Sequence, residues 1–445
     1  MDRDTAEPSV SSLPGERSRE WVDYHHERAA PSTYVFEFVW DHTAPAEGPF
    51  CTDVDGNVLM DMTSHVAAAP LGYNNPKLTE RMAEFDLPDP AKIAGQDFYV
   101  ASGPLDDHDF PGPADLMERL TDRSARYGMD TVFLSNSGAE AVENAIKICY
   151  DRTEGQHAVT FEGAFHGRTL GALSLNRSKS VYRRDFPQIS GVHEVPFCDD
   201  RACDPDSCSC GFFAGDGSQL RRMLRPDRGY VDPENLAYVI LEPVQGEGGY
   251  RFPSEAFMSE VAALCDEHDL LLVADEIQSG VGRSGEFWAS DHYPIEPDVI
   301  ASAKGLRVGA TISRSDVFPD ERSRLSSTWG AGDIVASLQG TLTLDVIDDY
   351  DLMDNAVVKG RQFQETVRDA DPEPIVDVRG KGLLLAVEFD TEERRDAVQE
   401  AAFQRGLLLL GCGEKTIRVL PPLDVTEREV SIAVDLLTDA IAEVA

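Results

Sequence analysis

LLLVADEIQSGVGRSGEFWASDHYPIEPDVIASAKG, residues 270–305, contains two short apolar runs that each end at a polar side chain. The runs are LLLVA (270–274) and DVIASA (298–303). Neither alternates strictly between apolar and polar residues, as a strand with one solvated face would. Such runs are typical of parallel strands that are covered on both faces. Asp275 follows the first run and Lys304 follows the second, and ligands of open parallel sheets bind beyond these carboxyl ends.

Three further runs of this kind precede the segment: TVFL (131–134), HAVTF (157–161) and LAYVIL (236–241). Helical periodicity appears between several of them. In residues 138–150 the apolar positions Val142, Ala145, Ile146 and Cys149 fall on one helical face. Buried strands that alternate with helices predict βαβ units, and therefore an α/β domain with a mostly parallel sheet.

The two ends of the chain have a different character. Residues 50–62, FCTDVDGNVLMDM, predict a hairpin that turns at Asp55-Gly56-Asn57. A long helical stretch at 334–370 leads to IVDVRGKGLLLAVEF (375–389), which predicts strands around a glycine turn. The remaining predicted elements are a helix at 391–404, the runs LLLLG and IRVLPPL, and a last helix near 426–443.

These patterns predict a large domain flanked by the two parts of a smaller α+β domain. The predicted parts are a loose N-terminal arm (1–32), the N-terminal part of the small domain (33–65), the large domain (66–340) and the C-terminal part of the small domain (341–445).

Charge excludes several classes of partner. The chain of 445 residues has 80 Asp and Glu against 40 Lys and Arg, a net charge of −40. Nucleic acids and anionic membranes are polyanions, so neither is an expected partner. Only eight of the basic residues are lysines, and lysine depletion beside such an acidic excess favours a protein from a salt-accumulating halophile. The N-terminus has no apolar leader and no run is long enough to span a bilayer, so we expect a cytoplasmic protein.

Each polar residue at a strand end has two interpretations. Ser137, Gly138 and Ala139 could form only a helix N-cap, or they could present backbone amides to a phosphate. Asp275 could cap a helix or hold a buried cation. Lys304 could be a surface lysine or a desolvated amine that forms a Schiff base.

Three other side chains could have purely structural roles when each is taken alone. Phe165 could be a core residue, and Arg168 and Arg418 could form surface ion pairs. Taken together, a phosphate cradle, an aromatic face, a strand-end aspartate and a strand-end lysine are the parts that a pyridoxal phosphate site needs.

The chain resembles the class III (subgroup II) pyridoxal phosphate-dependent aminotransferases. This group includes 4-aminobutyrate, ornithine, acetylornithine and lysine 6-aminotransferases, and the acidic composition favours a halophilic archaeal type. The most specific motif is the pair of segments 270–289 and 297–305, which places Asp275 and Lys304 at the spacing of the family signature. Supporting motifs are NSGAEAVENAIK (136–147), FHGRTLGALS (165–174), EPVQGEGG (242–249), STWG (327–330) and IRVLPPL (417–423).

The resemblance implies roles for individual residues. It implies fold-type I, with an α/β/α large domain, and pyridoxal 5'-phosphate as the cofactor. Amides around Ser137, Gly138 and Ala139 would hold the phosphate. The other implied cofactor contacts are Phe165 on the ring, Asp275 on the ring nitrogen, Gln278 on the ring hydroxyl, Lys304 as the Schiff base, and Thr328 on a phosphate of the neighbouring subunit. The last contact implies a homodimer with shared active sites.

The resemblance also implies how substrates bind. Arg168 would anchor the carboxylate of the amino donor. Glu247 would cover Arg418 while the donor is bound, and would release it for the second carboxylate of 2-oxoglutarate. The implied activity is an ω-aminotransferase that moves a terminal amino group to 2-oxoglutarate, giving a semialdehyde and glutamate. 4-Aminobutyrate, lysine and ornithine types of donor all fit.

Two other functions are compatible with the same fold. Some relatives are amino-acid racemases or an aminomutase, but these isomerases have no need for the Glu247 and Arg418 pair. A non-catalytic binding protein would have no need to retain Asp275, Gln278 and Lys304 together. Both alternatives therefore rank behind amino transfer.

Four cysteines lie close together in HEVPFCDDRACDPDSCSCGFF, residues 193–213. Cys198, Cys203, Cys208 and Cys210 could hold a structural zinc ion, or they could be reduced thiols of a surface insertion. Their spacing, C-x4-C-x4-C-x-C, is not that of a standard zinc knuckle. On this spacing we assign no residue to a metal site.

Overall fold

The computed structural model describes residues 1–30, 38–87, 95–96, 100–102, 110–201, 203, 205–215, 217–326, 330–370 and 373–444. The chain divides into two compact units. The large unit is Glu80–Asp349, and the small unit combines Met1–Thr79 with Tyr350–Ala445. Sequence analysis predicts these two boundaries between residues 65 and 66 and between residues 340 and 341. α3 (Pro76–Met82) crosses the first limit between the units.

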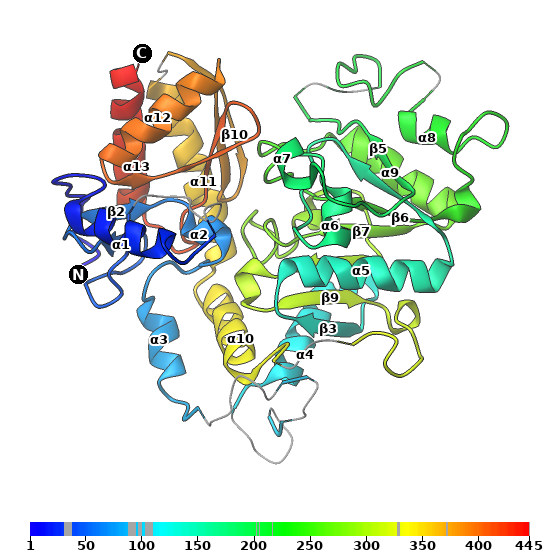
Figure 1. Ribbon diagram of the computed structural model, residues 1–445, viewed down its shortest axis with the longest axis horizontal. Helices are drawn as coiled ribbons and strands as arrows, with labels where there is room; N and C mark the ends of the chain where they lie inside the picture. The colour runs from blue at the N-terminus through cyan, green and yellow to red at the C-terminus, as the bar shows by residue number, and fades with distance from the viewer. Residues whose placement is uncertain are drawn as a thin grey trace. The chain divides into compact units, whose positions relative to one another are not determined.

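A seven-stranded sheet forms the centre of the large unit, with the strand order β3-β9-β8-β7-β6-β4-β5 (Figure 1). Only β9 runs antiparallel to its two neighbours, which confirms the predicted mostly parallel sheet. The strands are β3 (Thr131–Ser135), β4 (His157–Phe161), β5 (Val192–Val195), β6 (Leu236–Leu241), β7 (Leu271–Asp275), β8 (Val299–Ser302) and β9 (Gly309–Ser313).

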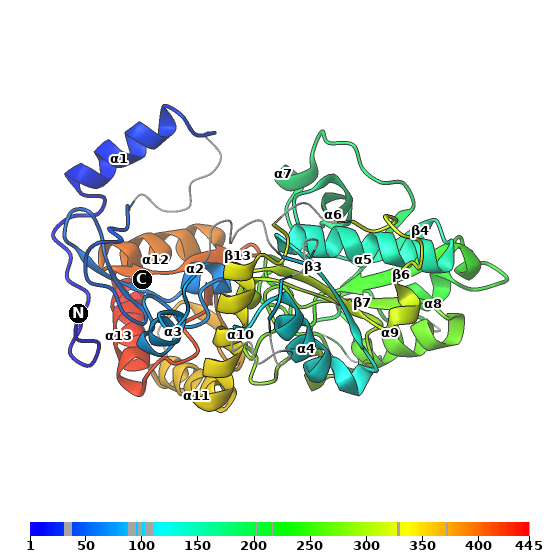
Figure 2. The same ribbon diagram turned by 90° about the horizontal axis from the view of Figure 1, so that it is seen from below.

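Both faces of this sheet are buried, which explains the continuous apolar runs in the sequence. Along β6, Tyr238 and Ile240 pack with residues of α5 (Gly138–Thr153). The alternate residues Val239 and Leu241 pack with residues of α9 (Glu255–His268) on the opposite face. Figure 2 shows α5 and α9 on opposite sides of the strands.

The other helices of the large unit are short, apart from two at its ends. They are α4 (Pro113–Ser124), α6 (Leu170–Leu175), α7 (Ser180–Arg183), α8 (Gln219–Met223) and α10 (Ile334–Asp349). The predicted helical stretch 334–370 is two helices, because Asp351 adopts a left-handed backbone conformation with φ of 50°. The second of them, α11 (Leu352–Ala370), belongs to the small unit.

The small unit contains two sheets and draws on both ends of the chain, as predicted. The predicted hairpin forms β1 (Phe50–Thr52) and β2 (Val58–Asp61), and β12 (Leu407–Leu408) pairs with β2 in parallel. The second sheet is antiparallel with the order β10-β11-β14-β13. Its strands are β10 (Ile375–Lys381), β11 (Leu384–Phe389), β13 (Leu410–Cys412) and β14 (Thr416–Val419).

Helices pack on these sheets and on one another. α12 (Glu392–Gln404) lies against α13 (Glu427–Val444), and α11 lies against α13 and β10. The unit also contains the short α2 (Ser64–Ala67). Within the N-terminal segment, α1 spans Glu16–His26. Arg3 forms ion pairs with Asp424 (2.7 Å) and Glu429 (2.6 Å).

Among the described residues, no helix combines the length and the apolar character needed to cross a membrane.

Candidate active site

A buried carboxylate stands at the end of β7. Asp275 is 4 % exposed, and its two oxygens have different partners. Oδ2 lies 2.7 Å from Nδ1 of His166, and Oδ1 accepts a hydrogen bond of 3.1 Å from the backbone amide of Ile277. The backbone amide of His166 in turn donates to Oδ1 of Asn176 over 2.6 Å. The carboxylate therefore has a fixed orientation, which a group that must face a cation requires.

Lys304 follows the neighbouring strand. β7 pairs with β8 in parallel so that Asp275 lies opposite Ala301, and Lys304 begins a 3₁₀ turn just beyond β8. A Cβ on Gly305 would lie 2.8 Å from Cβ of Val281. Glycine is thus needed where this turn packs against the segment that follows Asp275. The amine and the carboxylate belong to the same edge of the sheet, where ligands of parallel sheets bind.

The N-terminus of α5 lies at this edge too. Ser137 is the N-cap, and its hydroxyl accepts a hydrogen bond of 3.2 Å from the amide of Glu140. A Cβ on Gly138 would lie 2.8 Å from the side chain of Ile277, so the helix start packs directly against the segment after Asp275. The first amides of a helix have no acceptor within the helix, and with the helix dipole they favour an anion. The cap and the phosphate interpretations of Ser137, Gly138 and Ala139 are therefore compatible.

Tyr182 connects three of the predicted residues. Its ring contacts Phe165 edge-on with 5.3 Å between centroids, and the guanidinium of Arg168 lies 5.2 Å from the same ring. Its hydroxyl donates to Oε2 of Glu247 over 3.3 Å. Sequence analysis did not identify Tyr182, because it lies on the four-residue helix α7, which has neither an apolar run nor a motif.

Glu242 and Gln278 form hydrogen bonds with neighbouring segments of the site. Glu242 accepts hydrogen bonds of 2.9 Å from the amides of Phe165 and Gly246. Burial raises the pKa of Glu242 to about 7, with the charge of Asp275 acting in the same direction and His166 acting against it. Oε1 of Gln278 accepts a hydrogen bond of 2.8 Å from the hydroxyl of Tyr250.

Sequence analysis assigned no role to Glu242, His166 or Tyr250. The motifs EPVQGEGG and FHGRTLGALS contain the first two, so those motifs were the signal that could have identified them.

Two further predicted site residues are Arg418 and Thr328. Arg418 lies on β14 in the small unit, is 5 % exposed, and stands opposite Ala386 and Leu410. Thr328, predicted to contact a phosphate, lies outside the described residues.

Comparison with known proteins identifies the family. Residues 39–441 match the family model "Aminotransferase class-III", so the chain belongs to the class III aminotransferases and is an enzyme. Class III aminotransferases depend on pyridoxal phosphate. This confirms the predicted family and the fold-type I architecture.

Several relatives match along most of their length. The acetylornithine aminotransferase of Methanopyrus kandleri is 32% identical over 433 residues, covering 95% of this chain and 98% of the relative. The putrescine aminotransferase of Pectobacterium atrosepticum is 32% identical, covering 86% and 79%. Among solved structures, the lysine aminotransferase of M. tuberculosis in the internal aldimine form is similar with a TM-score of 0.78. It is 27% identical, with coverage of 96% of this chain and 99% of that chain.

Proposed function

We propose that this enzyme is an ω-aminotransferase that moves the terminal amino group of an amino acid to 2-oxoglutarate, with a semialdehyde and glutamate as products. The observation that carries the proposal is the arrangement at one sheet edge. There the buried, oriented Asp275, the turn of Lys304 and the N-terminus of α5 come together, beside the cluster of Phe165, Arg168, Tyr182 and Glu247.

The residues at this edge fit pyridoxal phosphate. A helix N-terminus suits the phosphate, and Ser137, Gly138 and Ala139 would hold it. The half-buried ring of Phe165 is suited to contact the pyridine ring, and Gln278 the ring hydroxyl. Lys304 supplies a primary amine for the aldehyde. When bound, the cofactor supplies an electron sink beside the carbon that loses or gains the amino group.

The chain's own groups then have distinct tasks. Asp275 would place a negative charge against the ring nitrogen of the bound cofactor, and His166 keeps that carboxylate in place through the 2.7 Å hydrogen bond. Nζ of Lys304 takes and returns the proton at the substrate carbon that bears the amine. Because Asp275 and Glu242 are buried, their electrostatic effects are screened less than at the surface.

Substrate selection falls to the cluster around Tyr182. Arg168 is exposed at one side of the Tyr182 ring and would bind the donor carboxylate. Tyr182 restrains Glu247 through its hydroxyl. We propose that Glu247 alternates between this position and an ion pair with Arg418, which would bind the second carboxylate of 2-oxoglutarate once Glu247 withdraws. The 4-aminobutyrate, lysine and ornithine types of donor all carry a carboxylate for Arg168. The names of the relatives add support for donors with a terminal amine.

A donor screen tests this function. The purified, cofactor-loaded enzyme in concentrated KCl is mixed with each terminal amine in turn and no acceptor. We expect one donor to convert the aldehyde form of the cofactor to the amine form, as seen by the loss of its visible absorbance, and 2-oxoglutarate to reverse the change. If no donor converts the cofactor while a test amino acid is racemised, the enzyme is an isomerase.

A homodimer with shared active sites is part of the proposal. Leu170, Val181, Phe186 and Ile189 are large apolar side chains that are 40% to 59% exposed. They follow one another along α6, α7 and the segment after it, close in sequence to Arg168 and Tyr182. An exposed apolar group of this kind is typical of a surface that a partner covers.

We further propose that the enzyme is halophilic. Its net charge is −40, and the excess negative side chains repel one another unless salt screens them. The melting temperature is expected to rise with KCl between dilute buffer and about 3 M, where the Debye length falls below ~3 Å. Light scattering at high KCl is expected to give twice the chain mass. A melting temperature that stays constant or falls with KCl would contradict the halophilic assignment, and a monomeric mass would contradict the dimer.

A further inference from the structure

The four cysteines of the segment between β5 and α8 bring their sulfur atoms together. The Sγ atoms of Cys198, Cys203, Cys208 and Cys210 all lie within 4.8 Å of one another. Sγ of Cys203 is 3.0 Å from Sγ of Cys208 and 3.0 Å from Sγ of Cys210, and the last two are 3.4 Å apart. All four are free thiols.

The backbone is shaped to direct polar hydrogens at these sulfurs. Gly211 has φ of +85°, which reverses the chain after Cys210 and is a conformation that suits glycine. The amide of Phe212 then points at Sγ of Cys210 (3.4 Å), and the amide of Phe213 points at Sγ of Cys208 (3.3 Å). Amide hydrogens on cysteine sulfur stabilise thiolates and orient them as metal ligands. The turn therefore brings one backbone amide to each sulfur of the Cys-x-Cys pair.

We propose that these four cysteines bind one structural Zn²⁺ ion. A tetrahedral zinc with Zn–S bonds of ~2.3 Å needs sulfur atoms about 3.8 Å apart. The closest sulfurs are 3.0 Å apart and all four lie within 4.8 Å of one another, so each separation needs to change by at most about 1 Å. An iron–sulfur cluster with several irons needs its thiolates spread around a larger core, so the compact arrangement favours a single ion. Four soft thiolates in a tetrahedral arrangement favour zinc over the hard cations.

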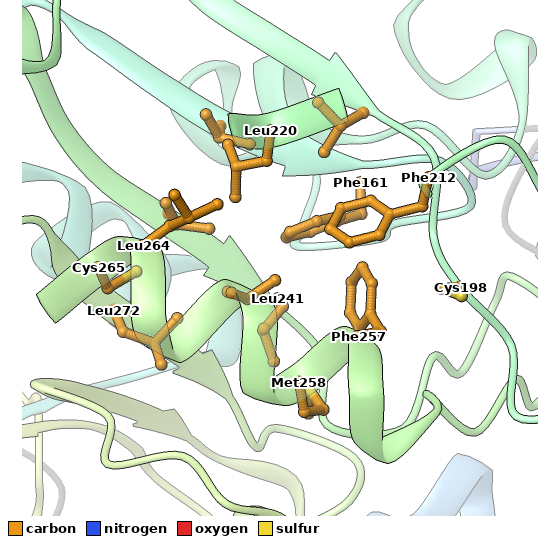
Figure 3. Packing of buried hydrophobic residues seen from close by; sticks show 14 of the residues in the cluster. Phe161, Cys198, Phe212, Leu220, Leu241, Phe257, Met258, Leu264, Cys265 and Leu272 are labelled. Carbon is orange, nitrogen blue, oxygen red and sulfur yellow. The ribbon is translucent and has the colours of Figure 1, made fainter. Parts of the chain in front are cut away.

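The surroundings of the cysteines suit a structural role. Cys198 and Cys203 are buried in the same apolar cluster as Phe161, Phe212 and Phe257, and Cys208 and Cys210 pack against it. Figure 3 shows the three phenylalanine rings pointing toward one another, with Cys198 on a loop beside them. No described histidine or carboxylate joins the four thiols as a ligand. Such a closed set of four protein ligands leaves no open position for a substrate.

The metal would clamp a segment that leads to the candidate active site. The carbonyl of Cys198 accepts from the amide of Ser254 (3.0 Å), and the amide of Asp200 donates to the carbonyl of Phe252 (2.8 Å). Arg251 donates to the carbonyl of Phe197 over 2.8 Å. The segment from Arg251 to Ser254 is separated only by Tyr250 from the EPVQGEGG motif, which contains Glu242 and Glu247. A rigid zinc site would therefore hold one end of a segment that lines the active site.

Metal analysis of the holoenzyme tests the proposal. Protein without a histidine tag, purified in high KCl without chelator, is measured for zinc and iron by mass spectrometry. We expect about one zinc per chain, because a structural site of four thiolates binds tightly at pH 7. Cys208→Ala is expected to lose the zinc and to melt at a lower temperature. The matched control Cys265→Ala removes a thiol from the same apolar cluster but is expected to keep the zinc.

A second measurement on the wild-type chain covers the case in which Cys208→Ala does not fold. Titration of the holoenzyme with an organomercurial reagent is expected to release zinc as the thiols react, and X-ray absorption at the zinc edge is expected to show four sulfur neighbours at ~2.3 Å. Less than about one zinc in five chains, zinc with nitrogen or oxygen neighbours, or one iron in place of zinc would each overturn the assignment. Retention of full zinc by Cys208→Ala would overturn it as well.

Discussion

The Lys304→Ala variant is expected to transaminate at least about 10⁴-fold more slowly than the wild-type enzyme, because it would lose both the covalent attachment of the cofactor and the proton carrier that we propose Lys304 to be. The measurement is kcat with the donor found in the screen and 2-oxoglutarate at saturation, in concentrated KCl. Borohydride reduction of the wild-type enzyme is expected to fix the cofactor on the peptide that contains Lys304.

Two further variants separate the chemical role of Lys304 from a role in folding. Lys304→Arg keeps the positive charge but cannot form the attachment, so it is expected to be as inactive as Lys304→Ala with an unchanged melting temperature. Lys147→Ala removes an exposed lysine of α5 and is expected to retain wild-type kcat. Substantial turnover by either Lys304 variant would show that the catalytic lysine lies elsewhere.

The Asp275→Asn variant is expected to lose about 10²- to 10³-fold in kcat, the size of effect that removal of one buried electrostatic partner has in other active sites. Asparagine keeps the shape of the side chain and can still accept the hydrogen bond from Ile277. It removes the negative charge that we propose to face the ring nitrogen of the cofactor. The control variant is Asp266→Asn, which changes an exposed residue of α9 and is expected to leave kcat unchanged.

Reconstitution with a modified cofactor distinguishes electrostatics from packing at Asp275. A pyridoxal phosphate analogue that is methylated at the ring nitrogen carries a permanent positive charge, so it needs no carboxylate to stay charged. Asp275→Asn is therefore expected to recover a large part of its lost kcat with this analogue. If the analogue leaves the variant as slow as before, Asp275 acts through the structure of the site and not through its charge.

The positions of Asp275 and Lys304 could be predicted because each follows a run that both faces of the sheet bury. Burial of the runs makes them visible in the sequence, and the parallel direction of the strands brings their ends to one edge. β9 was not predicted. Its sequence, GATIS, contains Thr311 and Ser313, whose hydroxyls are buried and donate to the carbonyls of Ala141 and Asp298. Because such polar residues find their hydrogen-bond partners only in the folded chain, a search for apolar runs does not recognise the strand.

Tyr182 and the cysteines illustrate a second limit. The importance of Tyr182 rests on contacts with Phe165, Arg168 and Glu247, and Glu247 is distant in sequence. The amide contacts to the sulfurs of Cys208 and Cys210 depend on a left-handed glycine between Cys210 and Phe212. Neither feature has a local periodicity, so only the folded backbone reveals it.

The parallel pairing of β2 with β12 has a consequence for how the protein is made. Leu407 and Leu408 complete a sheet that begins with the hairpin of β1 and β2, so this sheet cannot form until the ribosome has synthesised the chain as far as Leu408. The large unit is continuous in sequence and can fold first, since domains generally fold as units during synthesis. Throughout that time β2 lacks the strand that pairs with it in the folded protein, which is β12. The hairpin of β1 and β2 is therefore a segment that chaperones would protect until β12 has been synthesised.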